Sequence, residues 1–215
     1  MFRAITRTQW KSSRGLVLLA TILAFAIPIA SFRTATDVRA QGGLFLGAIA
    51  SWSVAYSVAA AGIGLSLAMI AWSPDHRGRH VYALTLPVAR WRYVLMRLGA
   101  GALFIAAPVA ALLVSAEVVA HSSSIPIGLQ AFPIALTIRF TIAALVAYAL
   151  FFAITAATAR TAGIIITIIA VFCAATYLAA AADVHTTFFE RTIEWIFATP
   201  GLLSVFTGRW MLIDA

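Results

Sequence analysis

Long apolar stretches without a charged residue alternate with short basic segments along the whole chain. An α-helix rises about 1.5 Å per residue, so about 20 apolar residues cross a hydrocarbon core of about 30 Å. The pattern therefore predicts an all-α, polytopic membrane protein with a single transmembrane domain over residues 1–215. The predicted membrane-spanning helices are residues 15–32, 41–72, 98–116, 141–159 and 161–182.

The second stretch, residues 41–72, is too long for one straight crossing. As a single helix it would be about 48 Å long. It must therefore tilt, bend or project from the membrane. Gly62 and Gly64 are candidate positions for a bend, although glycine in a membrane helix serves close packing against a neighbour equally well.

Residues 1–14 carry a regular set of basic side chains. Arg3, Arg7, Lys11 and Arg14 follow one another at steps of four, four and three, which places them on one face of a helix. We expect a short amphipathic helix that lies in the membrane interface with its basic side toward the lipid headgroups. A charged leader without helical structure is the alternative.

The tail, residues 183–215, has the least regular pattern. Its longest uncharged run, residues 195–208, is short for a crossing and is interrupted at Pro200. We expect a tail on the outer surface or a re-entrant segment, with Trp195 and Trp210 at the membrane interface. A sixth crossing is the alternative.

The composition separates this chain from soluble proteins. Hydrophobic residues make up 63% and charged residues 10%, whereas a soluble domain has about 25% charged residues. The one cysteine, Cys173, excludes an intrachain disulfide. Basic residues outnumber acidic ones by 15 to 7. In so apolar a chain this excess indicates contact with anionic lipid and control of topology rather than binding of nucleic acid.

The distribution of the basic residues predicts the orientation. Ten of the 15 lie before the first predicted span, between the second and third, or between the fourth and fifth. Cytoplasmic loops carry the excess of lysine and arginine in membrane proteins. We therefore expect a cytoplasmic N-terminus and a cytoplasmic loop over residues 73–97, in the inner or plasma membrane of the cell.

The chain lacks the motifs of enzymes that bind nucleotides. A Walker-type phosphate loop needs glycines before a lysine, and no glycine precedes the single lysine, Lys11. The motifs of zinc proteases and of serine hydrolases are absent as well. We therefore expect no catalytic activity and no cofactor in this chain.

Two pairs of residues that include histidine have a spacing that could bind a metal. His76 and His80 are four residues apart beside Asp75, and Glu117 and His121 have the same spacing. A basic loop that contacts water or a partner explains the first pair more simply. We assign no metal site to either pair.

Glu117 and Arg139 are charges at the outer ends of the predicted spans 98–116 and 141–159. Ionisable groups at such positions tend to pair or to face a cavity. An ion pair between them at the outer rim is one hypothesis. The other is that Arg139 extends to the lipid headgroups by itself.

Residues 72–94, WSPDHRGRHVYALTLPVARWRYV, begin with acidic and basic residues, continue with a short apolar run and end in a Leu-Pro-Val-x-Arg turn. This segment resembles the first cytoplasmic loop of the membrane subunits of type-2 ATP-binding cassette (ABC) transporters. The basic segment before the first span and residues 200–214 resemble parts of the same family, so that the resemblance covers nearly the whole chain.

The resemblance implies a permease subunit of an ABC transporter, most simply an exporter. Two permease subunits, identical or different, would form the translocation path. Separate ATPase subunits would bind ATP and magnesium. The loop 73–97 would couple the two kinds of subunit. Its coupling residues would be Asp75, Arg77, Val81, Leu84, Leu86 and Arg90.

The resemblance leaves the number of spans and the role of the chain open. The family usually has six spans, so the last one would be absent, supplied by another subunit or formed by the tail. A non-transporting scaffold or assembly subunit is the alternative function, because it needs no motif. A secondary carrier is disfavoured, since no predicted span has a charge at its centre. No pattern in the sequence indicates which substrate would be transported.

Overall fold

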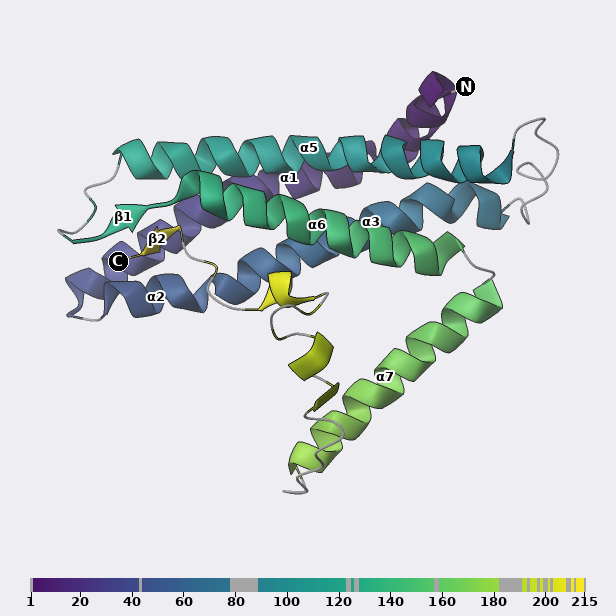
Figure 1. Ribbon diagram of the computed structural model, residues 1–215. Helices are drawn as coiled ribbons and strands as arrows, with labels where there is room; N and C mark the ends of the chain where they lie inside the picture. The colour runs from purple at the N-terminus through teal and green to yellow at the C-terminus, as the bar shows by residue number, and fades with distance from the viewer. Residues whose placement is uncertain are drawn as a thin grey trace.

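The computed structural model is a bundle of long helices with a short irregular tail (Figure 1). Its elements are α1 (Phe2–Ala40), α2 (Phe45–Ser51), α3 (Ser53–Arg77), α5 (Arg90–Ser122), β1 (Gln130–Ala131), α6 (Pro133–Ala156), α7 (Ala159–Ala181), the 3-10 helix η1 (Ser204–Phe206) and β2 (Ile213–Asp214). The structure describes residues 2–42, 44–77, 89–122, 125, 128–156, 159–181, 191, 192, 194–196, 198, 201, 203–207, 210 and 212–214.

Among the described residues, four helical segments are long and apolar enough to cross a membrane. They are Phe2–Ala40, Phe45–Ser73, Arg90–His121 and Pro133–Ala156. The predicted class, an all-α multi-pass membrane protein, is thereby confirmed. The predicted fifth span, residues 161–182, corresponds to α7, which is helical but is not one of these four segments. The fifth crossing and the orientation of the bundle stay predictions.

The first helix does not divide at residue 14. The sequence predicts a separate interfacial helix before the span 15–32, but α1 is continuous and about 58 Å long. One stripe of buried residues explains this continuity, because it keeps the spacing of a single helix across the expected boundary. The stripe consists of Gln9, Ser13, Val17, Ala20, Ala24, Pro28, Ser31 and Ala35.

The predicted stretch 41–72 divides at Trp52 rather than at either glycine. The backbone N–H of Trp52 donates to the carbonyl of Ile49 at 3.0 Å and ends α2. The indole Nε1 of Trp52 donates to Thr34 Oγ1 at 3.0 Å, which ties this turn to α1. Helix α3 then continues unbroken past Gly62 and Gly64 to Arg77.

Successive long helices along the chain run in opposite directions. Helices α1 and α5 run parallel, since Gln9 contacts the carbonyl of Arg97 and Ser115 donates to the carbonyl of Phe25. Tyr148, in the second half of α6, bonds to the first half of α5. One end of the bundle, which we call the basic end, therefore gathers the first turns of α1 and α5. At this end lie Arg3, Arg7, Lys11, Arg14, Arg77, Arg90, Arg92, Arg97 and Arg160.

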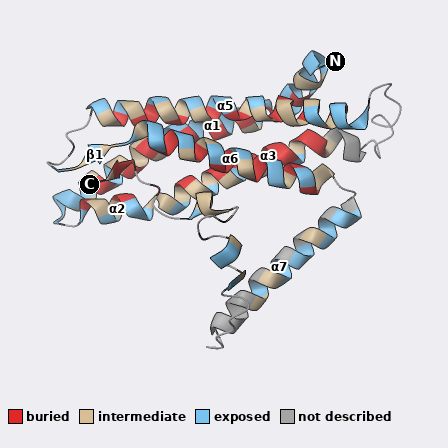
Figure 2. Ribbon diagram, viewed as in Figure 1, coloured by how far each residue is buried: buried red, intermediate tan, exposed pale blue. Residues whose placement is uncertain are grey.

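Buried side chains occupy the inner faces of four helices, α1, α3, α5 and α6 (Figure 2). Their outer faces carry exposed apolar residues such as Leu18, Ile22 and Leu103. An exposed apolar belt of this kind suits lipid, whose chains are as apolar as leucine. Helix α7 leans away from the bundle, and its described side chains are exposed or half-buried.

Gly64 allows α3 and α6 to approach each other closely. A Cβ atom at this position would lie 2.6 Å from the backbone nitrogen of Tyr148, 2.7 Å from Ala147 Cβ and 2.8 Å from the carbonyl oxygen of Ala144. Two of these atoms are backbone and cannot swing aside. A Cβ at Gly62 would meet nothing within 4 Å. Close packing is therefore the role of Gly64.

This difference predicts unequal effects of the same substitution at the two glycines. Gly64→Ala should lower the free energy of unfolding by about 1–3 kcal/mol, because the added methyl group separates α3 from α6. Gly62→Ala is the matched control and should change it by less than about 0.5 kcal/mol. Thermal unfolding of both purified variants in the same detergent measures the difference. Equal stability of the two variants would contradict the close contact.

Candidate functional site

A buried arginine forms the centre of the basic end. Arg97 lies in the second turn of α5 and is 4% exposed. Its guanidinium carbon lies 5.0 Å from the ring centroid of Trp72 in α3 and 5.3 Å from that of Tyr93. The guanidinium also donates a hydrogen bond to the hydroxyl of Tyr93. Aromatic faces and this hydroxyl thus replace part of the water that a buried cation loses.

The backbone at Arg97 joins two further helices. Gln9 of α1 donates from Nε2 to the Arg97 carbonyl at 3.4 Å. The hydroxyl of Tyr148, from α6, donates to the Leu98 carbonyl at 3.1 Å. This hydroxyl fits because residue 101 is glycine, where a Cβ atom would overlap it.

Residues from all four of the long apolar helical segments therefore meet at one place. We call it the Arg97 cluster, and it consists of Gln9, Trp72, Tyr93, Arg97 and Tyr148. The cluster flanks the segment between α3 and α5, because Trp72 precedes the end of α3 and Tyr93 follows the start of α5. The cluster thus joins the four segments next to the ends of α3 and α5.

The structure describes three of the six predicted coupling residues. Asp75 and Arg77 lie in the last turns of α3, and Arg90 begins α5 with its side chain exposed. Helical structure therefore extends into both ends of the predicted loop 73–97. The other three predicted coupling residues, Val81, Leu84 and Leu86, lie outside the described residues.

A second cation–aromatic contact holds the tail at the opposite end of the bundle, which we call the tail end. The guanidinium carbon of Arg139, from α6, lies 4.9 Å from the ring centroid of Trp210. Arg139 Nε donates to the Val205 carbonyl at 3.2 Å, and its Nη2 donates to the Thr207 carbonyl. The Trp210 ring packs edge-on against Phe140, with 6.5 Å between the centroids.

Backbone contacts fix the same part of the tail. Strand β2 pairs antiparallel with β1, and the N–H of Phe132 donates to the Leu212 carbonyl at 2.8 Å. The hydroxyl of Ser53 bonds to both the N–H and the carbonyl of Trp210, at 3.4 and 3.5 Å. Trp210 is only 1% exposed. The sequence places Trp210 at the membrane interface, but the structure buries it inside the tail end.

The structure does not bring Glu117 and Arg139 together. The Glu117 carboxylate lies 3.4 Å from His121 Nδ1, one turn along α5. Arg139 contacts the tail instead. Between these two described residues the hypothesised ion pair is therefore not formed. The tail carbonyls, which are more than 60 residues away in sequence, occupy the guanidinium.

Neither end of the described structure contains a set of residues that could ligate a metal ion. No group of three His, Cys, Asp or Glu residues among the described positions could hold an ion. Side chains at Asp75, His76 and His80 are not among those described. The contact between Glu117 and His121 joins two residues only.

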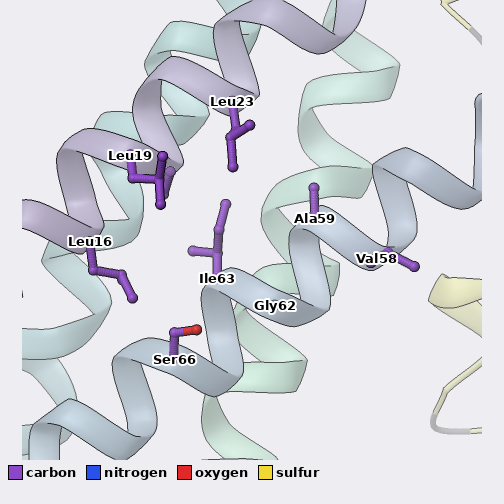
Figure 3. A pocket seen from close by; sticks show the side chains of 9 residues that line it. Leu16, Leu19, Leu23, Val58, Ala59, Gly62, Ile63 and Ser66 are labelled. Carbon is purple, nitrogen blue, oxygen red and sulfur yellow. The ribbon is translucent and has the colours of Figure 1, made fainter.

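An open apolar crevice lies between α1 and α3 (Figure 3). Its volume is about 270 Å³. Leucines of α1 point across it toward Ile63 and Ser66 of α3, and Ser66 supplies the one side-chain hydroxyl. Its lining selects for apolar groups but offers little to orient a ligand. The lining residues are Leu16, Leu19, Ala20, Leu23, Val58, Ala59, Gly62, Ile63 and Ser66.

Comparisons of the chain with models of protein families, with curated proteins and with solved structures gave no match. The function must therefore be argued from the residues and their arrangement.

The contacts of Arg139 predict which partner is energetically coupled to it. A double-mutant cycle of Arg139→Gln with Trp210→Leu should give a coupling of about 0.5–2 kcal/mol in the free energy of unfolding. The same cycle with Glu117→Gln in place of Trp210→Leu should be additive within about 0.3–0.5 kcal/mol. Unfolding in mixed detergent measures both cycles. A larger coupling to Glu117 than to Trp210 would contradict the arrangement.

Proposed function

We propose that the chain is the transmembrane permease subunit of an ABC exporter. It would form the translocation path together with a second permease subunit. Separate ATPase subunits would bind ATP and magnesium and would supply the energy. The resemblance of residues 72–94 to the family's coupling loop and the multi-pass helical body support this proposal.

The observation that carries the proposal is the position of the Arg97 cluster. Trp72 and Arg97 are in contact, and they lie on either side of the segment that bears the family-like motif. Gln9 and Tyr148 extend the same contacts to α1 and α6. An ATPase subunit that moved this segment would therefore move the four helices together. A chain without a phosphate loop needs such a route for energy from outside.

The proposal includes an orientation and a fifth crossing. The basic end would face the cytoplasm, because positively charged segments stay on that side of the inner or plasma membrane. Helix α7 would be the fifth span, and the tail end would lie outside. The contact of the tail with Arg139 and Ser53 supports placing its described residues, 203–207, 210 and 212–214, at the same end as β1.

A scaffold or assembly subunit is the second candidate. Helix α7 favours it, because this helix stands apart from the bundle and exposes Ile164, Ile168 and Val171. Such a face offers a surface to another membrane subunit. A scaffold would bind partners without changing the activity of an ATPase, and this difference separates the two functions.

The orientation is tested by labelling single cysteines from outside intact cells. In a chain whose Cys173 is replaced by alanine, a cysteine at position 78 should remain unlabelled and one at position 122 should react. Permeabilised cells are the control, and there both positions should react. Labelling of position 78 in intact cells would reverse the proposed orientation.

Coupling is tested by purifying the chain with its ATPase partner from native membranes. Leu84→Asp should abolish both co-purification and stimulation of ATP hydrolysis, because an unpaired charge replaces an apolar contact. Tyr148→Phe should leave co-purification intact and reduce stimulation severalfold, since it removes the hydroxyl that links α6 to α5.

The matched control for this experiment is Ala40→Asp, which adds the same charge at an exposed position of the tail end. Its co-purification with the ATPase partner and its stimulation of ATP hydrolysis should equal those of the wild type. A partner whose ATP hydrolysis does not respond to the chain or to any of the three variants would support the scaffold and exclude the permease.

A further inference from the structure

We propose that the basic end carries a binding surface for the headgroups of anionic phospholipids. Exposed cations on the first turns of α1 and α5 form this surface, which we call the cationic collar. It consists of Arg3, Arg7, Lys11, Arg14, Arg90 and Arg92. The inference needs α1 and α5 to lie in a membrane, and it does not depend on the proposed transport function.

The cations of α1 are held in one orientation. Gln9 and Ser13 of the same turns are buried against the bundle. Trp10 packs on Phe104 of α5, with 5.5 Å between the ring centroids. These contacts prevent the helix from rotating about its axis. The stripe formed by Arg3, Arg7, Lys11 and Arg14 is therefore presented to the surroundings, on turns that project from the bundle (Figure 1).

The first turn of α5 adds an aromatic residue to the collar. Trp91 is 61% exposed, and the guanidinium carbon of Arg92 lies 5.2 Å from its ring centroid. Arg90 precedes it and is exposed as well. An exposed tryptophan beside arginine is the pair of side chains that membrane proteins place at headgroup depth.

Few acidic residues lie near the collar in the sequence. None occurs in residues 1–36 or 76–116, the two segments that contain all six cations, and the acidic residue next to the second segment is Asp75, in the last turns of α3. Cations this close to one another repel, and an external anion relieves the repulsion. The partner must therefore supply several negative charges spread over a surface, as a leaflet of anionic lipid does.

The surroundings of the collar favour lipid over a soluble polyanion. Exposed aromatic residues accompany the cations, namely Phe2 and Trp10 on α1 and Trp91 on α5. The lipid-facing belt begins one turn after the last α1 cation, at Leu18, and one turn after the first cations of α5, at Leu95. The cations nearest the belt therefore lie next to it, and the earlier ones on α1 lie about two to four turns before it. Cations interleaved with exposed aromatic residues are typical of a helix face in the membrane interface.

The test uses the full chain in dodecyl maltoside, titrated with the anionic lipid POPG or the zwitterionic lipid POPC. POPG should raise the thermal midpoint more than POPC does, and added salt should reduce this difference. In the variant Arg7→Gln/Lys11→Gln, the apparent dissociation constant for POPG should rise at least about tenfold. The matched control Arg33→Gln/Arg39→Gln removes the same charge from exposed positions at the other end of α1. In this control the apparent dissociation constant for POPG should be unchanged.

Three results would overturn the proposal. Equal effects of the two variants would mean that net charge alone attracts POPG. Equal shifts with POPG and POPC would mean that the headgroup charge is not recognised. A shift of the same size with polyglutamate or an oligonucleotide in place of lipid would assign the collar to a soluble polyanion.

Discussion

The backbone of a chain in hydrocarbon must satisfy its own hydrogen bonds, and this constraint determines where the chain is regular and where it is not. The described spans are helical apart from the turn at Trp52 between α2 and α3. Irregular backbone occurs at the ends of the bundle, where side chains or a paired strand form hydrogen bonds with the backbone. At the tail end, the hydroxyl of Ser53 and the guanidinium of Arg139 bond to backbone atoms that lack a helical partner. Strand β2 obtains its partners from β1 in the same way.

Each end of the bundle has an arginine that lies over a tryptophan, fully buried at one end and half-buried at the other. Arg97 lies over Trp72 at one end, and Arg139 lies over Trp210 at the other. In each case the guanidinium bridges elements that are distant in sequence and so holds an end of the bundle together. Guanidinium is suited to this role, because its planar face stacks on an aromatic ring while its edge still donates hydrogen bonds.

The class of the protein and the approximate positions of four of the five predicted spans could be predicted from the absence of charge alone. The continuity of α1 could not, because the basic residues before position 15 resemble a boundary, although the spacing of Gln9, Ser13 and Val17 already continues the buried stripe. In the sequence, Arg97 is one of ten basic residues that indicate the orientation, and nothing in the charge pattern distinguishes it. The signal that could have found it is Tyr93, which precedes it by one turn on the same helical face. The contact between Arg139 and the tail has no local signal, since it joins residues far apart in sequence.

The bonds between Ser53 and Trp210 have a consequence for the order of assembly. They join residues separated by 157 positions. A ribosome delivers the chain from its N-terminus, so α1 to α6 can insert and pack before residue 210 has been made. Until then the contacts of the Trp210 ring with Phe140 and with the guanidinium of Arg139 cannot form. The tail end is therefore completed after the helices that it joins, and its closing contact binds the start of α3 to a residue that is made long after it.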